Sequence, residues 1–228
     1  MDDDLTSLSP KPSRDRPLAG MSVLLVEDSR YASEAIRLLC LKSGARIRRA
    51  DCLASAHRHL SVYRPAVVVV DMGLPDGSGA ELISELCGHA GGPVVLGLSG
   101  DRDAEQVALD AGADGFLAKP VDSLAAFQQI VLSAAAPEMR PMGPRPIART
   151  EVFHDPAALA EDLLNAADLL KDAKESGEFE YLAHFLRGVA LSSRDTELGA
   201  ACDALAEGPG PALWRVEKLL RNRIAASA

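Results

Sequence analysis

The fold of this chain is decided by the stretch VVVVDMGLPDGSG, residues 67–79. An unbroken aliphatic run ends at Asp71, and a loop rich in glycine follows it. Similar short runs recur before and after this stretch, and each precedes a longer segment with the apolar spacing of a helix. The aliphatic runs occupy residues 22–27, 45–50, 66–71, 93–99 and 114–119. Because five strands each precede a helix, the sequence predicts an α/β domain with a five-stranded, doubly wound parallel sheet covered on both faces.

The pattern changes after residue 136. Residues 137–150 read PEMRPMGPRPIART, and a segment with four prolines cannot continue a helix. We therefore predict a semi-rigid linker over residues 137–152. Beyond it, four helical stretches separated by Ser-Gly and Gly-Pro signals predict an all-α four-helix bundle over residues 153–228. These stretches are residues 155–177, 178–193, 194–208 and 211–222.

The first 19 residues, MDDDLTSLSPKPSRDRPLA, are polar, contain prolines and show no period. They predict a disordered tail over residues 1–19, so the first domain spans residues 20–136. The longest aliphatic run, residues 66–70, is far shorter than the ~20 residues that cross a bilayer, and the N-terminus has no apolar signal region. We expect a cytoplasmic protein that does not bind a membrane.

The charge is acidic and evenly divided. The formal net charge is -9, with 10 Lys and Arg against 14 Asp and Glu in residues 20–136, and 11 against 15 in residues 137–228. A protein that binds nucleic acid normally concentrates positive charge on one domain, because it must neutralise phosphates. The composition therefore argues against a nucleic-acid partner.

Five polar residues fall where the predicted strands end. In an open parallel sheet, ligands bind outside the carboxyl ends of the strands. These residues are Glu27, Asp28, Asp71, Ser99 and Lys119. Converging carboxylates repel one another unless a cation lies among them, and hard oxygen ligands suit Mg²⁺. The sequence predicts a magnesium site at this edge of the sheet.

This set of side chains suits phosphoryl transfer. Magnesium together with Lys119 would offset the charge of a phosphoryl group moved to the Asp71 carboxylate, which gives a covalent acyl phosphate. Ser99 can hydrogen-bond a phosphoryl oxygen. In the loop after Asp71, the backbone carbonyl of Gly73 is a candidate further metal ligand, and Pro75 fixes the turn.

The stretches VLLVEDS, VVVVDMGLPDGSG, GLSG and GADGFLAKP resemble the response-regulator receiver domain of two-component signalling. The resemblance covers about residues 20–136 and implies a flavodoxin-like fold. It also implies a metal-binding acidic pair at Glu27 and Asp28, phosphorylation at Asp71 and a phosphate-contacting lysine at Lys119.

The same resemblance implies a switch hydroxyl at Ser99 and a switch aromatic at Phe116. Phosphorylation would draw Ser99 toward the phosphoryl group while Phe116 turns inward, which changes the face around the fourth helix and fifth strand. Phe116 lies next to Leu117 on a short strand, so a plain core ring is the alternative. Gly100 stands where alanine is more usual in the family.

The helical stretch EYLAHFLRGV, residues 180–189, carries a histidine on its outer side. Successive helical residues advance ~100°, so Leu182, Phe185, Leu186 and Val189 form a core stripe that His184 faces away from. An exposed histidine is most often an ordinary surface residue. Here Arg187 can hold an oxyanion, Gly188 leaves room for a docking protein, and Leu191 offers an exposed apolar contact.

These residues resemble the histidine-containing phosphotransfer (Hpt) domain, whose signature runs histidine, two residues, lysine and glycine. The resemblance implies a phosphoryl-accepting His184, because a neutral imidazole is a competent nucleophile near pH 7. Arg187 departs from the usual lysine and trades a point charge for a planar fork. The small glycine-containing turn usual after the histidine helix is also absent, and Asp195 or Thr196 is a candidate cap of the next helix.

Together the two resemblances imply a phosphorelay protein with phospho-acceptors at Asp71 and His184, a phosphoryl carrier rather than a multiple-turnover enzyme. Its expected partners are a sensor histidine kinase and other receiver or phosphotransfer proteins. In one alternative, the C-terminal helices form a partner-binding module without histidine chemistry. In another, they form a helix-turn-helix output that binds DNA, which the acidic composition disfavours.

Overall fold

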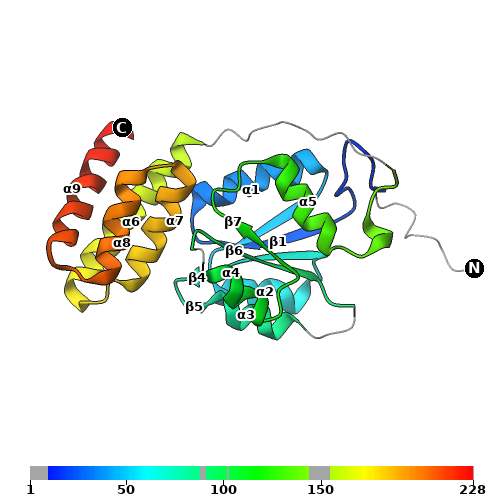
Figure 1. The fold of residues 1–228 in the computed structure, drawn as a ribbon, viewed down its shortest axis with the longest axis horizontal. Helices are drawn as coiled ribbons and strands as arrows, with labels where there is room; N and C mark the ends of the chain where they lie inside the picture. The colour runs from blue at the N-terminus through cyan, green and yellow to red at the C-terminus, as the bar shows by residue number, and fades with distance from the viewer. Residues whose placement is uncertain (1–9, 88–90, 102, 144–154, 228) are drawn as a thin grey trace, which may run out of the picture.

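The structure is a computed structural model that describes residues 10–87, 91–101, 103–143 and 155–227. Figure 1 shows two parts, which we call the sheet domain (residues 10–143) and the helical domain (residues 155–227). Among these residues, no helix combines the length and the apolar character that a membrane span requires.

The sheet domain contains the predicted parallel sheet. Its strands are β1 (Ser22–Val26), β2 (Arg46–Ala50), β3 (Val67–Asp71), β6 (Val94–Ser99) and β7 (Gly115–Ala118). All neighbouring pairs run parallel, in the order β2-β1-β3-β6-β7. The sequence prediction of five parallel strands is confirmed. A small antiparallel pair, β4 (Gly73–Leu74) and β5 (Gly77–Ser78), lies in the loop after β3 and was not predicted.

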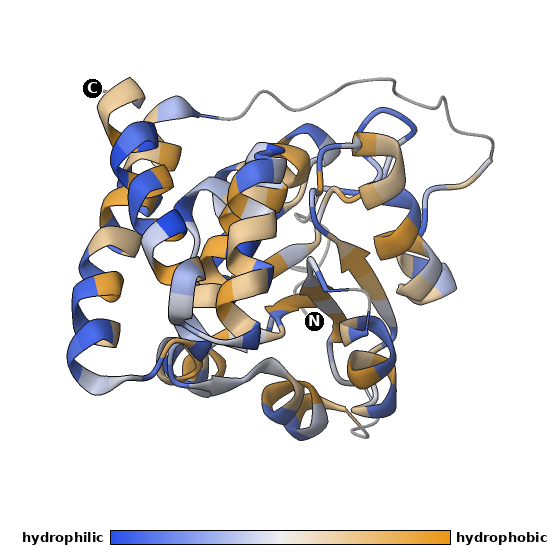
Figure 2. Cartoon of the chain, turned by 60° about the vertical axis from the view of Figure 1, so that its left-hand side comes forward, coloured by the Kyte–Doolittle hydropathy of each residue, from blue (hydrophilic) through white to orange (hydrophobic). Residues whose placement is uncertain are grey.

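Helices cover both faces of the sheet, because successive strand residues point to opposite sides. Val67 and Val69 pack into a core beneath α1 (Arg30–Ser43) and α5 (Leu124–Ala134). Val68 and Val70 pack into a second core on the other face. The helices on that face are α2 (Leu53–Val62), α3 (Gly79–Leu86) and α4 (Ala104–Asp110). In Figure 2 the strands form an apolar centre between these helices.

The N-terminal tail ends earlier than the sequence indicated. Leu18 is 0% exposed and packs into the core beneath α1, and its backbone N–H donates to the Ser43 carbonyl oxygen at 2.9 Å. The prediction of disorder over residues 1–19 is therefore wrong at its C-terminal end. Leu18 is surrounded in the sequence by polar residues and prolines, so the composition of the segment gave no sign that this one residue is buried. Residues 1–9 and much of the predicted linker lie outside the described residues, and within the linker Pro137–Met139 form a turn of 3-10 helix.

Four helices make up the described part of the helical domain. They are α6 (Pro156–Ser176), α7 (Glu180–Ser193), α8 (Thr196–Glu207) and α9 (Gly210–Ser227). Each helix packs against the next one in the chain, and α9 also packs against α6. Their shared core includes Leu163, Leu186, Leu205 and Leu220. Of the two candidate caps, Asp195 and Thr196, it is Asp195 that caps α8, since its carboxylate accepts from the Leu198 N–H at 3.0 Å.

The helical domain packs against the sheet domain through α6 and α7. These two helices contact α1, and α7 also contacts β4 (Figure 1). Because α1 and β4 both begin just after a strand ends, this contact lies at the carboxyl end of the sheet. The docking therefore brings the second domain to the edge where the sequence places the candidate site.

We predict that Asp195→Ala destabilises the helical domain by about 1–2 kcal/mol, since Asp195 caps α8 and also pairs with Arg223 at 2.7 Å. Hydrogen exchange of the α8 amides across a urea series follows the unfolding of this domain. The Arg223 hydrogen bond holds the pKa of Asp195 below its ordinary value. The stabilisation by Asp195 is therefore present at neutral pH and is lost as the pH falls through that lowered pKa.

The matched control is Asp168→Ala, which removes an exposed ion pair with Lys171 on α6 and is expected to leave the unfolding midpoint unchanged. Equal unfolding midpoints for Asp195→Ala and wild type would contradict the assigned role.

Candidate functional site

An acidic cluster forms where β1 and β3 end. β1 pairs directly with β3, so Glu27 and Asp28 lie beside Asp71. One carboxylate oxygen of each of these three residues lies within 4.8 Å of the others. Glu27 is 0% exposed and Asp71 is 1% exposed, so the cluster is largely withdrawn from water. The structure thus brings together the three predicted metal ligands.

Lys119 supplies the positive charge of this cluster. It follows β7 and is buried, with Nζ 3.1 Å from Asp71 Oδ2 and 2.8 Å from Glu27 Oε2. The two carboxylates hold the pKa of Lys119 above its ordinary value against the effect of burial. A charged ammonium therefore contacts the predicted phospho-acceptor.

One ammonium does not balance three carboxylates. Burial and then the neighbouring Glu27 raise the pKa of Asp71 to about 7, although Lys119 opposes the shift. Burial, Glu27 and Asp71 raise the pKa of Asp28 to about 8. Because like charges in a low-dielectric site disfavour ionisation, a further cation would stabilise the ionised cluster.

The donor set fits a magnesium ion. Asp71 Oδ1 is buried and accepts no hydrogen bond from the residues that the structure describes. A buried carboxylate oxygen without a partner is unfavourable, and hard cations prefer such oxygens. Glu27, Asp28 and Asp71 are the residues that would hold the ion. Ligation by the Gly73 carbonyl stays a prediction.

Ser99 ends β6, the strand beside β3, and Phe116 lies on the next strand, β7. Ser99 is buried, and its hydroxyl accepts from the Asp101 N–H at 3.0 Å. Phe116 is partly buried and packs against the core on the α4 side, next to Gly97 and Ala108. The structure therefore places the predicted switch pair where the sequence indicated, while their switching stays a prediction.

His184 lies at the interface between the domains. It is half-buried and lies outside the core of its own domain, as the helical period predicts. A Cβ atom built on Gly73 would lie 2.0 Å from His184 Nε2, so the imidazole rests directly on this glycine. Gly73 is two residues beyond Asp71. Burial and Lys119 lower the pKa of His184, which favours the neutral imidazole.

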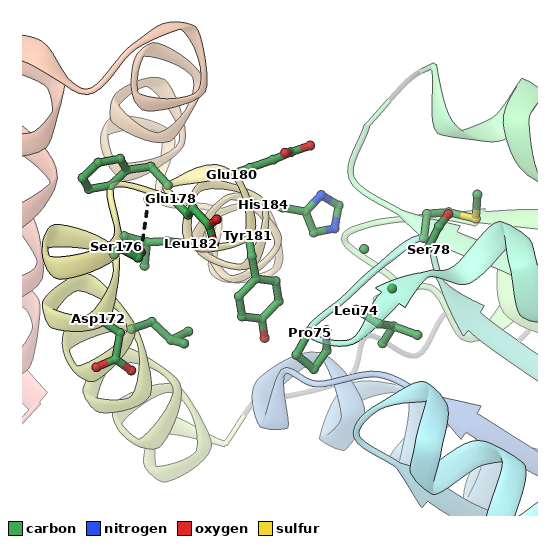
Figure 3. A pocket seen from close by; sticks show the side chains of 16 residues that line it. Leu74, Pro75, Ser78, Asp172, Ser176, Glu178, Glu180, Tyr181, Leu182 and His184 are labelled. Atoms are coloured by element: carbon green, nitrogen blue, oxygen red, sulfur yellow. Dashed lines mark hydrogen bonds between the residues drawn. The ribbon is translucent and has the colours of Figure 1, made fainter.

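A cleft of about 1040 Å³ opens beside this histidine. The β4–β5 loop forms one wall, and residues of α6 and α7 form the other. Figure 3 shows the ring of His184 and the side chain of Tyr181 directed toward the loop that carries Leu74 and Pro75. The cleft gives His184 one open side while α7 stays docked.

The other predicted docking residues also touch the sheet domain. A Cβ atom on Gly188 would lie 3.4 Å from Lys119 Nζ, and one on Gly100 would lie 2.1 Å from Leu191 Cδ1. The absence of a side chain at Gly100 thus makes room for Leu191. Arg187 pairs with Asp203 of α8 at 2.8 Å and with Asp101 of the sheet domain at 3.3 Å. The contact of Arg187 with a phosphoryl group stays a prediction.

Two interface residues were missed from the sequence. The Tyr181 hydroxyl donates to Asp28 Oδ2 at 2.7 Å. Asp162 of α6 is 3% exposed and accepts three hydrogen bonds from the start of α1. A signal for Asp162 was available, because it shares the buried stripe of α6 with Ala158 and Ala166, where a carboxylate is unusual.

The fold and the acidic site together define a receiver of the two-component type, and the comparisons with known proteins agree. The family model described as the response regulator receiver domain matches residues 23–131. The transcriptional regulatory protein KdpE of Mycobacterium tuberculosis is 31% identical over 166 residues, which cover 71% of this chain and 72% of that protein. The chain therefore belongs to the response regulator family.

Other known proteins match a shorter share of the chain. The KDP operon transcriptional regulatory protein KdpE of Escherichia coli is 33% identical over 100 residues, 43% of this chain and 44% of that protein. Thus the chain spans less than half of that relative. A solved receiver domain from Methylobacillus flagellatus, described as CheY-like, is 26% identical with a TM-score of 0.46, and the match covers 50% of this chain and 98% of that one.

We predict that Mg²⁺ raises the unfolding temperature of the wild-type sheet domain, since an ion that binds only the folded state stabilises it by ~2.7 kcal/mol at 100 times its Kd. Glu27→Gln is expected to remove most of this shift, because it deletes one charge of the cluster. Glu105→Gln, an exposed change on α4, serves as the control and keeps the shift. Calorimetry with and without Mg²⁺ measures it, and equal shifts in Glu27→Gln and wild type would place the ion elsewhere.

Proposed function

We propose that this response regulator is a phosphorelay protein in which Asp71 and His184 exchange a phosphoryl group within one chain. The observation that carries the proposal is the position of α7 across the carboxyl end of the sheet. His184 lies on Gly73, and Gly188, about one turn further along α7, lies beside the ammonium of Lys119. Since Lys119 contacts Asp71, the two contacts bracket the predicted phospho-acceptor.

The exchange needs only groups at this interface. A nitrogen of the neutral His184 imidazole attacks the phosphorus of the Asp71 acyl phosphate, a P–N bond forms, and the P–O bond to Asp71 breaks. The Asp71 carboxylate keeps the electron pair, and the reverse step restores the acyl phosphate. Lys119 and the Ser99 hydroxyl contact the phosphoryl oxygens. A magnesium ion bound at Glu27, Asp28 and Asp71 would offset the charge of the phosphoryl group.

The helical domain serves in this proposal as an Hpt-like four-helix bundle. The neighbour relations of its helices and the outward position of His184 on α7 support this assignment. Arg187 takes the place of the family's lysine and offers a second cation near the transferred group. A sensor histidine kinase, or another receiver or phosphotransfer protein, would exchange phosphate with Asp71 or His184.

Phosphorylation of Asp71 would be reported through Ser99 and Phe116. Ser99 would move toward the phosphoryl group, and Phe116, whose ring packs beside Gly97 and Ala108, would turn further inward into the space that Ser99 leaves. The face formed by α4 and β7 changes shape as a result. The unphosphorylated and phosphorylated proteins would therefore have two different structures at this face.

A DNA-binding output is the second candidate function. It is favoured by the match to KdpE of Mycobacterium tuberculosis, which is named a transcriptional regulatory protein and aligns over 166 residues, further than the sheet domain extends. The acidic balance of residues 137–228, with 11 basic against 15 acidic residues, opposes it. Retention of the purified chain on DNA at physiological salt would favour this candidate over the phosphorelay.

Chemical lability of the phosphoryl label tests whether His184 accepts a phosphoryl group, which the proposed exchange requires. With a labelled small phosphodonor and Mg²⁺, we predict an acid-labile, base-stable signal in wild type that His184→Ala loses, since a P–N bond such as that of phosphohistidine has this lability and an aspartyl acyl phosphate does not. Asp71→Ala is expected to keep the His184 label but to lose the acyl phosphate. His57→Ala removes a histidine on the exposed surface of α2 and should change neither signal.

Label confined to Asp71 with every donor would contradict the relay. The helical domain would then be a partner-binding module without histidine chemistry.

A further inference from the structure

A buried carboxylate of the helical domain caps a helix of the sheet domain. Asp162 of α6 accepts from the Ser29 hydroxyl at 2.7 Å, the Arg30 N–H at 2.9 Å and the Tyr31 N–H at 3.0 Å. These donors belong to the first turn of α1, whose backbone N–H groups have no partner within the helix. Ser29 also caps α1 internally, because its oxygen accepts from the Ala32 N–H at 3.0 Å.

This contact is buried, unlike the ion pair next to it. Asp162 is 3% exposed, whereas the Arg30–Glu161 pair has side chains 61% and 55% exposed, and pairs of that kind contribute little. A carboxylate at a helix N-terminus is favoured by the helix dipole and by charge-assisted hydrogen bonds. Removing Asp162 would take away the acceptor that these three donors share across the interface, and so would favour separation of the domains.

The docked helical domain also covers the phospho-acceptor. Asp71 is 1% exposed and Lys119 is 8% exposed while α7 lies on Gly73 and Gly100. Another protein that exchanges phosphate with Asp71 needs the same edge of the sheet. It therefore reaches Asp71 only when the two domains separate.

We propose that Asp162 is a positioning residue that latches the two domains, holds His184 beside Asp71 and closes Asp71 to other proteins. The part that concerns His184 rests on the proposed function. The latch makes two opposite contributions: it favours transfer within the chain and opposes transfer between chains. A residue needed only for folding would favour both kinds of transfer.

Amide exchange tests the latch without any phosphoryl chemistry. In full-length Asp162→Ala, hydrogen exchange of the Arg30 and Tyr31 amides is expected to be at least about tenfold faster than in wild type, because each loses its acceptor. Glu161→Ala is the matched control, since it removes the adjacent exposed pair with Arg30 and should leave these amides protected. Unchanged exchange in Asp162→Ala overturns the latch.

Two transfer rates test its consequence. Within one chain, His184 is loaded by phosphoramidate without magnesium, and transfer to Asp71 starts when Mg²⁺ is added. Between chains, an Asp71→Ala chain loaded on His184 donates to a His184→Ala acceptor. Adding Asp162→Ala is expected to slow transfer within the chain and, placed in the acceptor, to speed transfer between chains, each by about tenfold.

The outcomes separate the latch from the proposed function. Opposite changes of the two rates support the latch, and a fall in both rates overturns it, because it indicates a folding role. Asp162→Asn keeps an acceptor oxygen, so its two transfer rates are expected to lie between those of wild type and Asp162→Ala. If His184 never carries phosphate, the proposed function fails, and amide exchange alone decides the latch.

Discussion

The structure depends on one buried ammonium among three carboxylates. The order of the strands places β1 beside β3, so the residues that end them, Glu27, Asp28 and Asp71, meet, and Lys119 reaches both Glu27 and Asp71 from the end of β7. Burial makes their repulsion strong, which is why the pKa values of Asp71 and Asp28 rise to about 7 and about 8. The site is thus built to gain a cation, and with one bound it can offset the charge of a phosphoryl group.

The second domain turns this edge into an interface. Glycines at three points, Gly73, Gly100 and Gly188, let α7 approach the sheet domain closely. The same approach that brings His184 toward Asp71, the proposed phospho-acceptor, lays α7 over the edge of the sheet where Asp71 is 1% exposed. Asp162 and Tyr181 link the interface to the residues just after β1, because they bind the start of α1 and Asp28. Docking of the helices and the state of the acidic cluster are therefore coupled through direct contacts.

Local sequence patterns predicted most of the elements and the receiver residues. Strand ends locate Asp71 and Lys119 at one edge because parallel strands share a direction, and the helical period places His184 outside its own core. Leu18 was missed because a single apolar residue in a polar segment has no period. Asp162 on the buried stripe and Gly100 in place of alanine were both visible in the sequence. Their partners, Ser29 and Leu191, lie in the other domain, and no pattern within a helix or loop specifies such a pairing.

The docked arrangement requires His184 and the acidic cluster to face each other within one chain. Mn²⁺ has the oxygen preference of Mg²⁺ and is paramagnetic, so at substoichiometric amounts it broadens the NMR signals of nearby nuclei. We expect strong broadening of the His184 ring signals, identified with His184→Ala, in a dilute full-length sample. Loss of this broadening in Glu27→Gln would tie it to the acidic cluster. His184 signals that stay sharp while Mn²⁺ broadens the amides around Asp71 would contradict the docked arrangement.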